Sequence, residues 1–156
     1  MPRRKIFRIK SRSGLGLKLD PVTAPLRKMP KTDPFPEIQP IQGMMPDSKE
    51  EYWVALALYR LNLDFEYQYQ LFGGRRYKGG QVVDFWVFTV PLPTPIMVQG
   101  YYFHYATAQK TAQTRLNIMY LKARLMGKAN EPVEIIDKDI PTPEDAYIEV
   151  KRKLKR

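Results

Sequence analysis

The chain of 156 residues contains no cysteine and only one histidine. The absence of cysteine excludes disulfide bonds, thiolate metal sites and a cysteine nucleophile, and it weakly supports an intracellular setting. No apolar run is long enough to span a bilayer, so we expect no membrane partner. Acidic residues are fewer than basic ones, at 16 against 26. The length nevertheless suffices for one domain with a hydrophobic core.

Basic charge is concentrated at the two ends of the sequence. The formal net charge is +10, of which residues 1–31 contribute +9 and residues 151–156 contribute +5, which leaves −4 for residues 32–150. Basic terminal segments commonly bind nucleic-acid phosphates, because binding releases counterions. The alternatives are a solubilising tail or an arm that docks on other proteins of an assembly. We predict DNA as the partner, contacted from the N-terminal segment by Arg3, Arg4, Lys5, Arg8, Lys10 and Arg12.

Prolines recur through the first 46 residues, where eight of the 14 prolines lie. Each proline blocks a helix at or before its own position. We therefore predict an extended, basic, proline-rich arm over residues 1–46 and one folded domain over residues 47–156.

The folded domain alternates between helical and strand patterns. Helices are predicted over 47–63 and 105–126 and from Pro143 onward, with Ser48 and Thr142 as N-caps. Strands are predicted over 64–72 and 81–90, from residue 96, and over 133–136. This order predicts an α/β domain with a central sheet and helices on its faces.

Two of these elements have a distinct apolar side. The strand pattern over 64–72 predicts that four residues point the same way: Phe65, Tyr67, Tyr69 and Leu71. The helical pattern over 105–126 places another set on one face: Ala112, Leu116, Met119, Tyr120 and Ala123.

Asp84 interrupts the apolar strand QVVDFWVFTV. Burying a carboxylate is costly unless it is paired, hydrogen-bonded or bound to a metal. Position alone leaves two interpretations equally open. Asp84 is either a functional acid or an aspartate that accepts hydrogen bonds from backbone N–H groups.

Several short segments together resemble the PD-(D/E)XK nuclease superfamily. In chain order they are SKEEYWVALALYRL, FEYQYQLFGG, VVDF and VQG, followed by GYYFH and a long helix. The segment GYYFH is most similar to the very-short-patch-repair endonuclease branch. The resemblance covers residues 48–140 and implies a restriction-endonuclease-like core, in which a central mixed sheet is flanked by helices.

The resemblance implies a set of site residues. Asp84 matches the motif aspartate, a Mg²⁺ ligand, and the backbone carbonyl of Val98 matches a second ligand. Glu51, or alternatively Glu50, matches the supporting helix glutamate. His104 matches the histidine that acts as general acid or base.

Two positions depart from the family pattern. The (D/E)XK pair falls on Met97 and Gln99, and a thioether at the acidic position is a poor ligand for a hard cation. Taken alone, His104 is more often a half-buried packing residue, and Gln99 is explained by one hydrogen bond. Four further basic residues are predicted to contact either nucleic acid or only solvent: Arg75, Arg76 and Lys78 in the glycine-bounded loop 73–80, and Lys110.

Two functions from different classes follow. The first is a Mg²⁺-dependent endonuclease that acts on DNA in the cytoplasm or at the nucleoid. The alternative is a catalytically inactive structural or DNA-binding component of a nucleoprotein assembly or virus particle.

Overall fold

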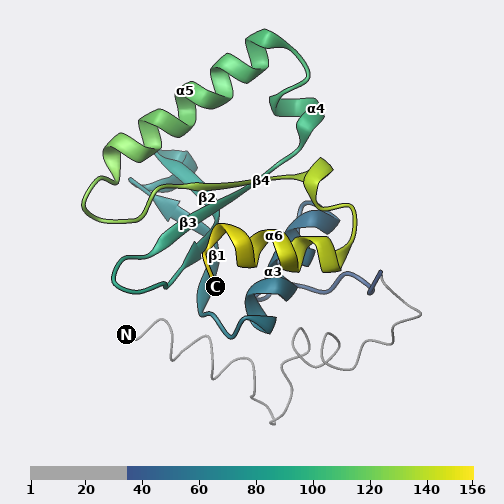
Figure 1. The fold of residues 1–156 in the computed structure, drawn as a ribbon. Coiled ribbons are helices and arrows are strands. Elements are labelled where there is room, and N and C mark those ends of the chain that lie inside the picture. The colour runs from purple at the N-terminus through teal and green to yellow at the C-terminus, as the bar shows by residue number, and fades with distance from the viewer. Residues whose placement is uncertain (1–34) are drawn as a thin grey trace. The chain divides into compact units, whose positions relative to one another are not determined.

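The computed structural model describes residues 35–156 (Figure 1). The six arm residues predicted to contact phosphate, Arg3 to Arg12, lie outside this range. The longer elements are α3 (Lys49–Arg60), β1 (Phe65–Leu71), β2 (Gln81–Val87), β3 (Thr94–Gln99), α5 (Ala108–Arg124), β4 (Val133–Ile136) and α6 (Pro143–Lys153). The short helical turns are η1 (Gly74–Arg76), α4 (Tyr101–His104) and η2 (Asp137–Asp139). None of the helices within residues 35–156 is long and apolar enough to cross a membrane.

The four strands form one mixed sheet in the order β1-β2-β3-β4. β2 pairs with β3 in antiparallel fashion, with Phe85 opposite Ile96. β3 pairs with β4 in parallel, with Met97 opposite Glu134. A parallel pair requires a crossover connection, and α5 lies in the segment that joins these two strands. The prediction of an α/β fold with a mixed sheet flanked by helices is confirmed.

The chain divides into two compact units. The described part of the first unit consists of residues 35–66 and 140–156, and the second unit consists of residues 67–139. Within the first unit α3 packs on α6. Arg60 of α3 lies 2.7 Å from a carboxylate oxygen of Glu144 and 3.7 Å from the ring centre of Tyr147.

Both predicted N-caps of the first unit are confirmed. The Ser48 hydroxyl accepts a hydrogen bond from the Glu51 N–H at 3.2 Å, and the Thr142 hydroxyl accepts one from the Asp145 N–H at 3.1 Å. Each cap satisfies one of the N–H groups that a helix leaves without a partner in its first turn.

Part of the predicted arm contributes to the first unit. Ile41 is fully buried, and the Gln42 side chain donates a hydrogen bond to the carbonyl of Phe65 at 2.7 Å. Residues 41 and 42 therefore belong to a folded unit, whereas the arm as far as residue 34 stays a prediction.

In the second unit, β1 does not keep its aromatic residues on one side. The Tyr67 ring contacts Phe85 at 5.3 Å, whereas the Tyr69 ring stacks on Trp86 at 4.7 Å. Consecutive strand residues such as Phe85 and Trp86 point to opposite faces. Gln68, between the two tyrosines, has a left-handed φ of 53°, which reverses the alternation. The prediction that Tyr67 and Tyr69 share a face is therefore wrong.

The face that carries Trp86 is covered by α5. Its buried cluster consists of Leu71, Val83, Trp86, Leu121 and Leu125. Within α5 itself, Thr114 and Leu121 are buried. The predicted apolar set of α5, Ala112 to Ala123, lies on the other side of the helix and is exposed.

The strand predicted from residue 96 ends at Gln99. The carbonyl of Gly100 accepts hydrogen bonds from the N–H groups of Phe103 and His104, each at 3.1 Å. The segment Tyr101–His104 therefore forms one helical turn, α4, instead of continuing β3.

Candidate functional site

Asp84 is bonded to the neighbouring strand. Its Oδ2 accepts a hydrogen bond from the Val98 N–H at 2.7 Å. The contact brings Asp84 of β2 next to Val98 of β3, as the resemblance implies. It also matches the structural interpretation of this residue, because a backbone N–H offsets the cost of a partly buried carboxylate.

Acidic residues lie on both strands beside β3 at this level. The pairing of β2 with β3 ends at Phe85 opposite Ile96, and the next residue of β2, Asp84, bonds to Val98 through its side chain. On the other side of β3, Met97 lies opposite Glu134 of β4. Glu134 is the acidic residue within the predicted strand 133–136 but is not among the predicted site residues.

The Glu134 carboxylate has a defined partner. The Tyr105 hydroxyl, between α4 and α5, donates a hydrogen bond to Oε2 of Glu134. Burial raises the pKa of Tyr105 well above its ordinary value of 10.0, and the hydrogen bond to Glu134 raises that pKa further. Tyr105 is therefore a neutral donor over the physiological pH range. The contact ties the start of the crossover to β4.

His104 faces α5. Its Nδ1 lies 3.4 Å from the hydroxyl of Thr114, and that hydroxyl also donates to the His104 carbonyl at 3.0 Å. Thr114 is buried. His104 thus has the contacts of a half-buried packing residue, which is the alternative left open by the sequence.

The remaining predicted catalytic residues are enclosed. Gln99, at the end of β3, is only 9% exposed. Glu51 is 7% exposed and completes the N-cap of α3 with Ser48. Glu51 belongs to the first unit, whereas Asp84, Gln99 and His104 belong to the second. Glu50, the alternative to Glu51, lies 4.0 Å from the Lys49 amino group.

The residues near Asp84 are a poor fit to Mg²⁺. One oxygen of Asp84 accepts an N–H bond, Met97 offers only a thioether, and Glu134 accepts the Tyr105 hydroxyl. Mg²⁺ prefers oxygen ligands in near-octahedral arrangement. Within residues 35–156, no three His, Asp or Glu side chains converge in a way that could hold a metal ion. We therefore derive no metal-dependent step from this site.

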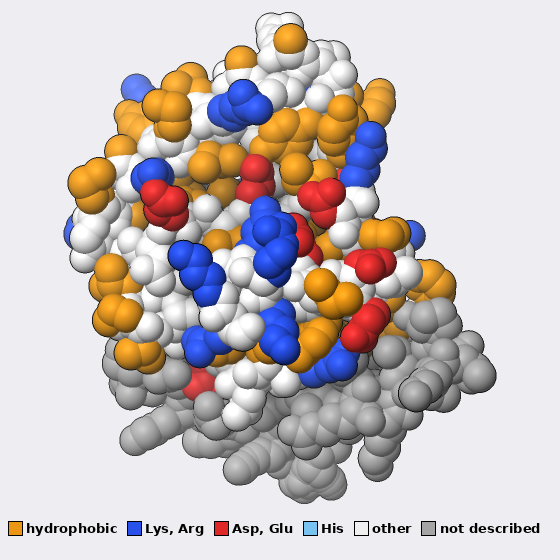
Figure 2. All heavy atoms as spheres, viewed as in Figure 1, with side chains coloured by type: hydrophobic (Ala, Val, Ile, Leu, Met, Phe, Trp, Pro, Cys, Tyr) orange, Lys and Arg blue, Asp and Glu red, His pale blue; other side chains and the backbone are white. Residues whose placement is uncertain are grey.

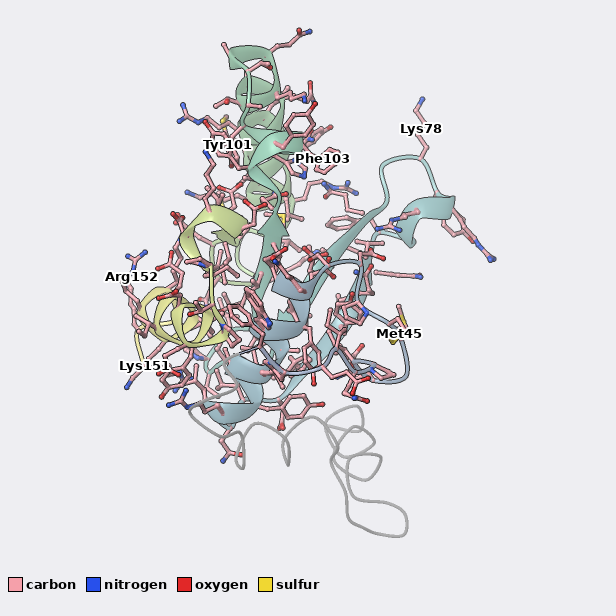
Figure 3. All side chains as sticks on the ribbon, turned by 90° about the vertical axis from the view of Figure 1, so that its right-hand side faces the viewer. Met45, Lys78, Tyr101, Phe103, Lys151 and Arg152 are labelled. Atoms are coloured by element: carbon pink, nitrogen blue, oxygen red, sulfur yellow. The ribbon has the colours of Figure 1, made fainter. Side chains whose placement is uncertain are left out.

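A different feature presents charge to solvent. Loop 73–80, which we call the basic loop, exposes Arg75, Arg76, Tyr77 and Lys78. Figure 3 shows Lys78 extending outward from the loop. In the described part of the chain, no carboxylate forms an ion pair with any of its three basic residues. Tyr77, which is not among the predicted site residues, is 67% exposed.

The basic loop has a fixed shape. A Cβ atom on Gly80 would lie 1.8 Å from the Gly74 carbonyl oxygen, so only glycine fits there. Arg124 of α5 donates a hydrogen bond to the Gly79 carbonyl and lies 3.5 Å from the ring centre of Phe72. The loop is thus held to the end of α5. Arg124 adds a fourth basic residue beside it.

Lys110 lies elsewhere in the second unit. Its amino group donates to the Tyr102 carbonyl at 3.1 Å and lies 4.7 Å from the Tyr102 ring centre. Tyr102 and its neighbour Phe103 are 68% and 73% exposed. Figure 3 shows Tyr101 and Phe103 leaving α4 on opposite sides. Lys110, in the first turn of α5, therefore contacts the exposed Tyr102 of α4.

The Asp84 contact predicts a graded loss of stability. We expect Asp84→Ala to lower the free energy of unfolding by about 2 kcal/mol, because a charge-assisted hydrogen bond is lost. Asp84→Asn keeps an oxygen acceptor for the Val98 N–H and should lose less than about half of that. Urea denaturation measures both, with the exposed Asp139→Ala as control. Equal destabilisation by Ala and Asn would show that this hydrogen bond is not what Asp84 contributes.

The Tyr105 contact predicts a pH dependence. A raised pKa in the folded state stabilises the fold while tyrosine is protonated in both states, and this contribution declines as the pH rises above about 10. Tyr105→Phe should lower the free energy of unfolding by about 1 kcal/mol at neutral pH. The difference from the unmodified protein should shrink near about pH 11. Tyr101→Phe, which keeps the ring that contacts Lys138, is the control. A difference that stays constant over this range would contradict the assignment.

The chain was compared with models of known protein families, with curated proteins and with solved structures, and none of the three comparisons found a match. Its function is therefore to be inferred from its own residues and contacts.

Proposed function

We propose that this chain binds DNA through the basic loop and does not cleave it. The observation that carries the proposal is the exposure of Arg75, Arg76 and Lys78 on a loop of fixed shape, with no ion-pairing carboxylate among the described residues. Unpaired basic side chains are available for phosphate oxygens, and a preshaped loop loses little conformational entropy on binding. The exposed Tyr77 adds a ring on which a base can stack.

The contacts of the expected catalytic residues support the second half of the proposal. Asp84 is bonded to the Val98 amide, His104 to Thr114, and Gln99 is enclosed. The Asp84 and His104 side chains thus already have roles in holding the fold, and Gln99 is closed off from solvent. The structure thus accounts for these residues without a reaction.

We further propose that the domain descends from the nuclease fold that the sequence resembles. The order of elements supports this proposal: a helix, a β-hairpin with the motif aspartate, a strand, a long helix and a final strand. The approach of Asp84 to Val98 supports it as well. On this view the basic loop and the predicted arm retain DNA binding, whereas Met97 occupies the position of the second motif acid.

An endonuclease remains the second candidate, because Asp84 does lie beside Val98 as the family pattern implies. We expect the purified protein to leave supercoiled plasmid intact in Mg²⁺ and in Mn²⁺, since the Asp84 carboxylate serves β3. Gel electrophoresis of the plasmid measures this. Nicking by the unmodified protein that disappears in the folded Asp84→Asn variant would replace our proposal with the endonuclease.

DNA binding itself is tested by removing the loop charges. We expect Arg75→Ala/Arg76→Ala/Lys78→Ala to weaken duplex binding by about tenfold or more and to reduce the dependence of log K on log salt by about 2 to 3, since each lost phosphate contact contributes about 0.9. Fluorescence anisotropy at several salt concentrations measures both.

The matched control removes the same charge elsewhere. Lys49→Ala/Lys122→Ala/Lys128→Ala also deletes three basic residues, of which Lys49 and Lys122 lie beside acidic side chains. The affinity of this control variant for duplex DNA, and the salt dependence of that affinity, should stay close to those of the unmodified protein. If both triple variants lost the same DNA affinity, the loop would contribute only through the net charge of the protein, which would contradict the proposed binding site.

A further inference from the structure

Helix α5 exposes an apolar stripe that residues 35–156, the part of the chain that the structure describes, do not cover. The stripe, which we call the α5 seam, follows the spacing 4-3-4-3 along the helix and the turn after it: Ala112, Leu116, Met119, Ala123 and Met126. Leu116 is 57% exposed, Met119 65% and Met126 74%. Tyr120, at the edge of the seam, is 66% exposed. Figure 2 shows hydrophobic side chains gathered over α5.

The seam is separate from the face that holds α5 in place. Thr114, Leu121 and Leu125 are buried on the other side of the helix, where Leu121 and Leu125 pack with Trp86. A helix that covers a sheet needs one apolar face. The seam is a second face, with the 4-3 spacing of residues that pack against another helix.

The seam is bordered by positive charge. α5 contains Lys110, Arg115, Lys122 and Arg124 and no acidic residue. Arg115 and Lys122 follow one side of the seam, each one position before a seam residue. A partner whose flanks carry carboxylates would form ion pairs with them.

The same charges disfavour a second copy of the chain. In an antiparallel pair of α5 helices, Arg115 and Lys122 of one copy would face the same residues of the other. In a parallel pair they would face positions such as Gln113 and Tyr120, which carry no carboxylate. The formal net charge of +10 adds further repulsion.

The small residues of the seam favour a protein helix over a lipid surface. Ala112 and Ala123 leave gaps on either side of Leu116 and Met119, and side chains of a facing helix fill such gaps. Helices that lie in the membrane interface present a broad apolar face rich in Trp, Phe and Leu. The α5 seam is narrow and contains neither Trp nor Phe.

We propose that the α5 seam docks an amphipathic helix of another protein, whose apolar stripe packs between the seam residues and whose flanks are acidic. Arg115 and Lys122 select for those flanks. The Lys122 side chain exchanges its present contact with Glu131, which is itself 74% exposed, for a carboxylate of the partner.

Two synthetic probes test the docking. Both are three-heptad peptides with leucine along the stripe, and they differ only in carrying Glu or Lys at the flanking positions. By fluorescence anisotropy, we expect the Glu peptide to bind at least about tenfold more tightly than the Lys peptide. Met119→Asp should abolish binding of the Glu peptide. Met45→Asp, at a methionine of similar exposure in the first unit, should not.

A charge reversal keeps the test decisive if Met119→Asp perturbs the helix. Arg115→Glu/Lys122→Glu should invert the preference toward the Lys peptide. Binding that is equal for both peptides, absent for both, or unaffected by Met119→Asp overturns the proposal. A dimer in sedimentation velocity that Met119→Asp dissolves would assign the seam to a second copy. Anionic vesicles that retain the protein only when Met119 is intact would assign it to lipid. Either outcome also overturns the proposal.

Discussion

The parallel pairing of β3 with β4 is the constraint on which the second unit depends. Because the two strands run in the same direction, the chain that leaves Gln99 must return to the opposite end of the sheet before Val133 can pair with Ile96. α4, Tyr105 and α5 make up this return. Their contacts fix the crossover at several points, from the His104–Thr114 bonds near its start to the packing of Leu121 and Leu125 at its end.

Three acidic residues, on β2, on β4 and in η2, hold β3 and the segment that follows it in place. Asp84 binds the Val98 amide, Glu134 binds the Tyr105 hydroxyl, and Asp137 accepts the Tyr101 N–H at 3.0 Å. Each of these acids is partly buried, where an unbonded carboxylate would be costly. Their common use in fixing β3 and the segment after it explains why acidic residues cluster here without forming a metal centre.

Much of the fold follows from sequence patterns. Capping signals at Ser48 and Thr142, and the short apolar run VEII, locate two helices and a strand closely, because these signals act between neighbouring residues. Local signals fail where one residue changes the geometry of those that follow it. Gln68 adopts a left-handed conformation and reverses the side of Tyr69, and no pattern in FEYQYQLF announces this.

The site was less predictable than the fold for a different reason. The resemblance implied that Asp84 and the Val98 carbonyl are ligands of one metal ion, whereas the contact in the structure runs from the Val98 N–H to the Asp84 carboxylate. Glu134 could be placed opposite Met97 only once the parallel register was known, since residues 37 positions apart share no local signal. For the same reason the apolar set of α5 could not be assigned to core or surface from its period alone. Both faces of that helix carry residues spaced by three and four.

α5 connects the two surfaces that we propose, the basic loop and the α5 seam. Arg124 anchors the basic loop through the Gly79 carbonyl, and its chain neighbour Ala123 belongs to the seam. A helix is stiff along its length, because each N–H is bonded to a carbonyl four residues earlier. A protein helix docked on the seam would therefore hold the segment that carries Arg124, and with it the loop that we propose contacts DNA. If such docking changes the affinity of the loop for DNA, reciprocity of linkage requires that DNA change the affinity of the seam for its partner by the same factor. A domain that had lost cleavage would in this way join DNA to another protein through one helix.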